Sequence, residues 1–166
     1  MKEETATSTA AFPFTPSSIT HGQLCDAVLQ FFAVELGIAA ARVYPLDNRD
    51  GTMEIGGHCP IRRDVDLIGY WQSRADPSPD PTEGLSEFNR SIDVGHTVLI
   101  ADSRTESSEA SGVKLAARVG GWNAQFEIRN TSLQTVYGPQ MVTDAQLEAA
   151  ARFLVDTTSR LDTGKW

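Results

Sequence analysis

The sequence predicts an α+β domain, a small sheet with helices packed on it. Three observations support this class. Residues 122–129 alternate between apolar and polar side chains, which is typical of a strand with one buried face. Residues 97–101 form a continuous apolar run of the length of a buried strand. Capping-box patterns at 20–23 and 143–146 each open a segment with helical spacing of apolar residues.

Length and composition limit the class of protein. With 166 residues, the chain can form one domain with its own core. Its formal net charge of −8 argues against a broad basic surface and so against nucleic acid as a partner. The first residues lack the features of a signal peptide, and no apolar stretch is long enough to span a membrane. We therefore expect a cytoplasmic protein in which Cys25 and Cys59 are reduced.

The chain is expected to begin with a tail and a helix. Residues 1–19 are rich in Thr, Ser, Ala and Pro without any period, so we expect them to be disordered. The folded domain is expected to span residues 20–162. Thr20 and Gln23 have capping-box spacing, and apolar residues then recur at helical intervals. The first helix should run from residue 21 to 36.

A hairpin is expected next. Residues 41–46 form its first strand, 47–51 its turn, and 52–59 its second strand, which Pro60 closes. The aspartates of the turn lack the ligand spacing of a calcium loop.

The middle of the chain is less regular. Residues 61–71 fit a strand or a helix. Prolines at alternate positions predict a loop at 76–81, which is either a lid or binding loop or a plain surface excursion. Helices are expected at 85–93 and 109–119, on either side of the apolar strand 97–101.

The last elements are two strands and a helix. Strand 122–129 is expected to pair with 133–137 through a turn at 130–132. A final helix at 144–161 carries a seam at spacings of four and three residues, formed by Leu147, Ala151, Leu154, Thr158 and Leu161. This seam could pack on the sheet or against a second copy of the chain.

The order of these elements resembles the GAF domain, a small sensory fold. Residues 93–104 resemble the GAF segment in which a helix ends at a glycine and a strand leads to an aspartate-containing loop. Residues 114–122 resemble the helix and turn before the central GAF strand, and residues 142–147 resemble the start of its last helix. PAS and roadblock-type domains have similar layers.

The resemblance implies an antiparallel sheet of five or six strands, with the terminal helices on one face and a ligand pocket on the other. The pocket would lie between the sheet and the segments 60–85 and 102–112. A signal would pass to a protein partner, or through a homodimer formed by the terminal helices. Gln125, Glu127 and Arg129 make the pocket face polar, which departs from an ordinary hydrophobic GAF pocket.

Six residues are candidate ligand contacts. His58 lies beside the irregular insertion. Arg62 belongs to a charged cluster that could orient an anionic ligand or remain a solvated loop. Tyr70 and Trp71 could roof a pocket or pack in the core. The remaining two, Asp102 and Arg104, follow the buried strand, where they could contact a ligand or cap a helix.

Catalysis and metal binding have less support. His58 and Cys59 are neighbours in a strand and point to opposite faces, so the histidine is poorly placed to activate the thiol. The histidines and cysteines lack the paired spacing of a zinc site. No catalytic residue, metal ligand or cofactor is therefore assigned.

Three functions remain open. The first is a regulatory domain that binds a small molecule and acts on a protein partner. The second is a small acid–base enzyme of the cyclase or isomerase type, which would use the region of His58, Cys59, Asp64, Asp66 and Asp102. The observation that would favour it is convergence of His58 and Asp102 in one cavity. The third is a ligand-free dimerisation module whose interface is formed by the helices 21–36 and 144–161.

Overall fold

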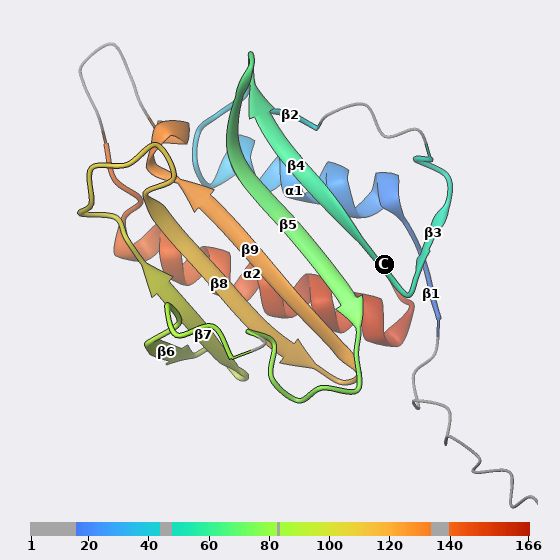
Figure 1. Ribbon diagram of the computed structural model, residues 1–166. Coiled ribbons are helices and arrows are strands. Elements are labelled where there is room, and N and C mark those ends of the chain that lie inside the picture. Colours follow the sequence, from blue (N-terminus) through green and yellow to red (C-terminus); the bar gives the residue numbers. More distant parts are fainter. Residues whose placement is uncertain (1–15, 44–47, 83, 134–139) are drawn as a thin grey trace, which may run out of the picture.

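The computed structural model describes residues 16–43, 48–82, 84–133 and 140–166, which form an α+β fold (Figure 1). The helices are α1 (His21–Val34), α2 (Asp144–Thr163) and the short 3-10 helix Asn130–Leu133. The strands are β1 (Ser17–Thr20), β2 (Arg42–Val43), β3 (Thr52–Glu54), β4 (Gly56–Arg63), β5 (Asp66–Ala75), β6 (Arg90–Asp93), β7 (Thr97–Asp102), β8 (Gly112–Val119) and β9 (Trp122–Arg129).

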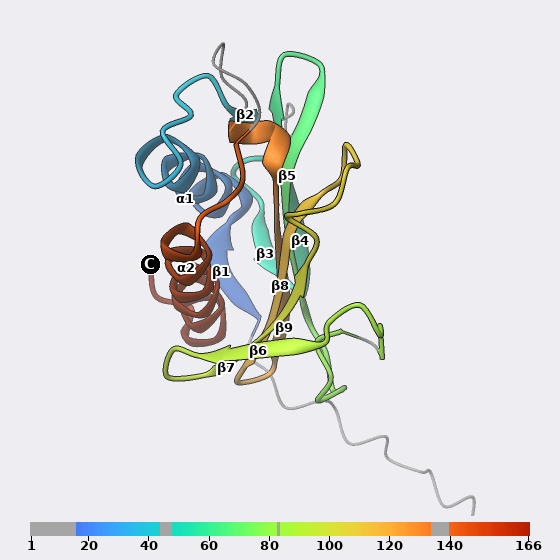
Figure 2. The ribbon, with the colours of Figure 1, turned by 90° about the vertical axis from the view of Figure 1, so that its left-hand side faces the viewer.

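The described strands form two sheets. The large sheet has seven strands in the order β2-β4-β5-β9-β8-β7-β6, and every neighbouring pair is antiparallel. A smaller sheet pairs β1 with β3. Figure 2 shows α1 and α2 side by side on one face of the large sheet, whereas its other face carries neither helix. The predicted α+β class is confirmed, but the large sheet has seven strands instead of five or six.

The additional strands come from segments that we expected to be helical. Residues 109–119 were predicted as a helix, but Gly112–Val119 is strand β8 and pairs with strands on both sides. Its buried Val113, Leu115 and Val119 follow a period of two, which fits a strand. Residues 85–93 contain β6 in place of the predicted helix. Both segments lie in the part of the chain on which the GAF resemblance rests.

The predicted hairpin is longer and shifted. β4 starts at Gly56 and continues through Pro60, where we expected the strand to end. Among the described residues, β2 pairs with β4 only at Ile61 and Arg62, so no described strand pairs with Pro60 on that edge, which is where a proline is tolerated. The ambiguous segment 61–71 belongs to two strands, β4 and β5. The predicted return strand at 133–137 begins in a 3-10 helix, and its remainder lies outside the described residues.

The start of the folded part also differs from the prediction. Strand β1 lies inside the stretch 1–19 that we expected to be disordered. Ile19 is 2% exposed, so the ordered chain begins before residue 20. Residues 1–15 lie outside the described part of the chain.

Both predicted capping boxes are present. The hydroxyl groups of Thr20 and Thr143 accept hydrogen bonds from the backbone N–H groups of Gln23 and Gln146, and each glutamine side chain accepts one in return. These caps fix where α1 and α2 begin. Neither of these helices is long and apolar enough to cross a membrane.

The seam of α2 packs against the sheet. Its five residues are at most 3% exposed: Leu147, Ala151, Leu154, Thr158 and Leu161. Of the two predicted uses of this seam, packing on the sheet is the one that the structure shows. A homodimer through the terminal helices stays a prediction.

The cysteine prediction is also wrong. Cys25 of α1 and Cys59 of β4 form a disulfide, with 5.5 Å between their Cα atoms and both residues fully buried. No local pattern in the sequence indicates that α1 lies over β4. Because disulfides are rare in the cytosol, the predicted cytoplasmic location loses the argument that rested on reduced thiols.

Candidate functional site

The face of the large sheet away from the helices carries polar side chains in rows across β4, β5 and β9. His58, Gln72 and Gln125 are register partners in one row. Tyr70 and Glu127 are partners in the next row. We call this surface the open face.

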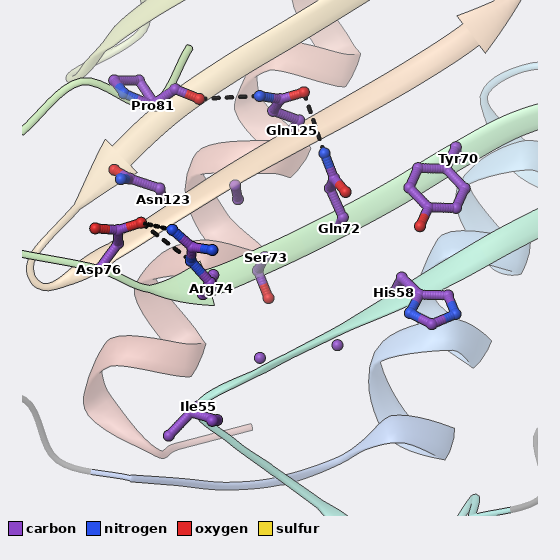
Figure 3. Close-up of a pocket in the computed structure, with 13 residues that line it drawn as sticks. Ile55, His58, Tyr70, Gln72, Ser73, Arg74, Asp76, Pro81, Asn123 and Gln125 are labelled. Atoms are coloured by element: carbon purple, nitrogen blue, oxygen red, sulfur yellow. Dashed lines mark hydrogen bonds and ion pairs between the residues drawn. The ribbon is translucent and has the colours of Figure 1, made fainter. Parts of the chain in front are cut away.

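A cavity of about 440 Å³ lies on the open face (Figure 3). Gly56 and Gly57 bring the backbone of β4 to it, and Ile55 lies at its rim with a 63% exposed side chain. Its polar lining consists of His58, Tyr70, Gln72, Ser73, Arg74, Asp76, Asn123 and Gln125. The volume lies within the usual range of small-ligand pockets.

Two glutamines link the sheet to the loop beside the cavity. The amide nitrogen of Gln72 donates to the side-chain oxygen of Gln125 over 3.2 Å. Gln125 in turn donates to the carbonyl oxygen of Pro81 over 3.0 Å. Because both atoms of the Gln125 amide are used, its orientation is fixed.

The loop that contains Pro81 forms one wall of the cavity, and we call residues 76–82 the proline segment. Arg118 of β8 donates to the carbonyl oxygens of Asp76, over 2.8 Å, and of Ser78. Asn123 of β9 donates to the same Ser78 oxygen over 3.0 Å. Three side chains of the open face therefore hold backbone carbonyls of the proline segment.

The charges at the cavity are paired. The Arg74 guanidinium lies against the Asp76 carboxylate. The Ser78 backbone N–H and the Arg74 side chain lower the pKa of Asp76, which keeps it ionised at neutral pH.

The cavity has two aromatic members, Tyr70 and His58. Burial raises the pKa of Tyr70, so its hydroxyl keeps its proton at neutral pH. The rings of Tyr70 and His58 are nearly parallel, at an angle of 18° with 5.9 Å between their centroids. The site thus offers a flat aromatic pair next to uncharged amide groups.

The structure brings together two of the six predicted ligand contacts, His58 and Tyr70. Trp71 is fully buried on the helix side of the sheet, because it is the neighbour of Tyr70 in a strand. Arg62 does not line the cavity; it donates to the Val65 carbonyl at the tip of the β4–β5 hairpin over 3.2 Å.

Asp102 and Arg104 form a separate cluster. Arg104 donates to both Asp102 oxygens, over 3.0 and 2.8 Å, and to the Val142 carbonyl over 2.9 Å, and it forms an ion pair with Asp144 at the start of α2. The hydrogen bonds from Arg104 lower the pKa of Asp102, and the Asp102 carboxylate raises that of Arg104.

This cluster fastens the start of α2 to the end of β7. It lines a second cavity, of about 780 Å³, that does not contain His58. His58 is on β4, and three strands separate β4 from β7 in the sheet. His58 and Asp102 therefore do not converge.

Sequence reasoning did not select Gln72, Asn123 or Gln125 as site residues. The alternation at 122–129 did place Asn123 and Gln125 on one polar face, but we interpreted that polarity as evidence against a pocket. Within the described residues, no group of histidine, cysteine or acidic side chains is arranged to hold a metal ion.

The chain was also compared with known proteins. No protein-family model, curated protein or solved structure matches it. The GAF resemblance therefore stays a prediction.

Proposed function

We propose that the protein is a binding domain whose site is the cavity on the open face. The observation that carries the proposal is the row formed by His58 and the uncharged amides of Gln72 and Gln125, beside the aromatic ring of Tyr70. Such groups orient a ligand by hydrogen bonds without demanding a charge on it. The ligand we expect is uncharged and rich in hydrogen-bond acceptors, since Gln72, Asn123 and Gln125 all act as donors on this face.

The place of the cavity supports the regulatory form of this proposal. It lies on the face opposite the terminal helices, as the GAF resemblance implies for a ligand pocket. A ligand that contacts Gln72 would compete with its bond to Gln125 and so act on the proline segment. Binding would then change the surface offered to a protein partner.

The enzyme alternative is less well supported. Convergence of His58 and Asp102 in one cavity would favour it, and they line different ones. In addition, Asp102 accepts hydrogen bonds from two arginines, which occupies the carboxylate as a structural anchor.

A titration followed by NMR tests the proposal. The ligands are an uncharged panel of sugars, nucleosides and capped amino acids, and the signals followed are the backbone amides of 56–58, 70–74 and 123–125. At least one panel member should shift these signals, and Gln72→Leu should weaken the effect. Arg152→Ala, on the exposed side of α2, is the matched control and should bind normally. No shift at these residues, or shifts confined to 102–104, would contradict the proposal.

A further inference from the structure

The proline segment is held on the open face in the manner of a bound peptide. Its carbonyl groups at Asp76, Ser78 and Pro81 accept hydrogen bonds from three side chains of β8 and β9. These three contacts are made to main-chain oxygens, and one side chain of the segment, Asp76, adds an ion pair with Arg74.

Apart from the backbone N–H of Asp76, which donates to the Gly121 carbonyl between β8 and β9 over 3.0 Å, the hydrogen-bonding groups that the proline segment gives to the sheet are acceptors. Prolines at 77, 79 and 81 have no N–H to satisfy. The N–H groups of Ser78 and Thr82 donate to the carboxylates of Asp76 and Asp80 within the segment, each over 2.9 Å. A face built from donors therefore matches an extended proline-rich chain.

The cavity extends the donor-lined surface of the open face past Pro81, onto β5. Gln72 follows Gln125 in the same row, and Tyr70 lies in the next row on β5. One N–H of the Gln72 amide donates to Gln125, and the second finds no acceptor among the described residues. Within the described residues, the Tyr70 hydroxyl makes no hydrogen bond and is free to donate as well.

The aromatic pair completes the match. Proline-rich segments adopt the extended polyproline II helix, and they dock in grooves where aromatic rings contact the proline rings. The nearly parallel rings of Tyr70 and His58 provide such a surface at the wall of the cavity.

We propose that the cavity binds an extended, proline-rich segment of a partner protein. This inference rests on the proposed function and names its ligand class. The partner segment would lie on β4 and β5, alongside the chain's own proline segment, and would give its carbonyl groups to Gln72 and Tyr70. It would be uncharged or basic, because the protein's net charge of −8 repels acidic chains.

Calorimetric titration of the full chain with two synthetic peptides tests the inference. The first is a capped octapeptide in which proline alternates with alanine and serine. The second has alanine at every proline position. The proline peptide should bind, and the alanine peptide should bind at least about tenfold more weakly, because it must first be ordered.

Variants locate the site. Tyr70→Ala should weaken binding of the proline peptide by about tenfold or more, as expected for a central aromatic contact. His58→Ala is the second variant, since its exposed side chain can be removed without disturbing the core. Arg152→Ala should bind like the unmodified chain, and circular dichroism confirms that each variant is folded.

The outcomes separate this inference from the proposed function. Equal binding of the two peptides, or binding that neither Tyr70→Ala nor His58→Ala weakens, would overturn the proline-rich ligand. The proline-rich ligand is also overturned if neither peptide binds while a small molecule shifts the NMR signals of 56–58 and 70–74. In that case the proposed function still stands. If neither peptide binds and no member of the small-molecule panel shifts the signals of these residues, both proposals fail.

Discussion

Gln125 occupies a position in which one side chain connects the sheet, the cavity and the proline segment. Its oxygen accepts from Gln72 and its nitrogen donates to Pro81. A neutral hydrogen bond of this kind contributes about 1 kcal/mol to stability, and more is lost when a partner is left unsatisfied.

Gln125→Leu should therefore release the proline segment without unfolding the domain. We expect faster amide hydrogen exchange at Ser78 and Thr82, and a loss of about 1 kcal/mol in the free energy of unfolding. Exchange followed by mass spectrometry measures the first effect, and urea unfolding measures the second. Gln30→Leu, at an exposed position of α1, is the control and should change neither. Unchanged exchange at 76–82 in Gln125→Leu would show that Pro81 does not depend on this bond.

At the level of residues, the sequence allowed part of the site to be predicted. The rule that neighbours in a strand point to opposite faces correctly separated His58 from Cys59. The same rule would have separated Tyr70 from Trp71, but 61–71 could not be assigned to a strand. The pairing of Gln72 with Gln125 depends on the register of β5 and β9, which are far apart in the chain, so no local pattern could reveal it.

At the level of elements, the end helices were predictable and the middle strands were not. Capping boxes and apolar spacing are local signals, and they fixed the starts of α1 and α2. In β8, by contrast, Lys114, Leu115 and two alanines are good helix formers, and pairing with β7 and β9 overrides that preference. Ala117 lies opposite Ala124 in the register, and both residues are buried.

The α2 seam provides a prediction at this scale. Leu154 has 0% exposure and lies in the chain's own core. Leu154→Glu should therefore unfold the protein, because it buries an unpaired carboxylate where a leucine packs. Circular dichroism and light scattering measure the fold and the mass.

The matched control is Ala145→Glu, at an exposed position in the first turn of α2, where a negative charge is favourable. It should leave the fold and the mass unchanged. If Leu154→Glu stays folded and has half the mass of the unmodified protein, the seam is a dimer interface, contrary to what its burial indicates.

For the whole molecule, the helix layer and the sheet are joined at separate places. The Cys25–Cys59 disulfide joins α1 to β4, and a link across 34 residues typically contributes about 2–4 kcal/mol by restricting the unfolded chain. The Arg104–Asp102 pair joins the start of α2 to β7, which three strands separate from β4 in the sheet. Both joints leave the open face free, so the side that would bind a ligand is not the side that holds the fold together.

The second joint predicts how the whole molecule responds to acid. Hydrogen bonds from Arg104 are the largest cause of the lowered pKa of Asp102, whose side chain is 19% exposed. A carboxyl whose pKa is lower in the folded than in the unfolded protein stabilises the fold above its unfolded value, near about 4, and that contribution is lost as the pH falls through the folded pKa. Urea unfolding midpoints at pH 7 and at pH 3 should therefore differ more for the unmodified chain than for Asp102→Asn. Asp156→Asn removes an exposed carboxylate of α2 paired with Arg160, and should keep the pH dependence of the unmodified chain. If Asp102→Asn loses as much stability on acidification as the unmodified chain, the joint between α2 and β7 does not depend on the charge of Asp102.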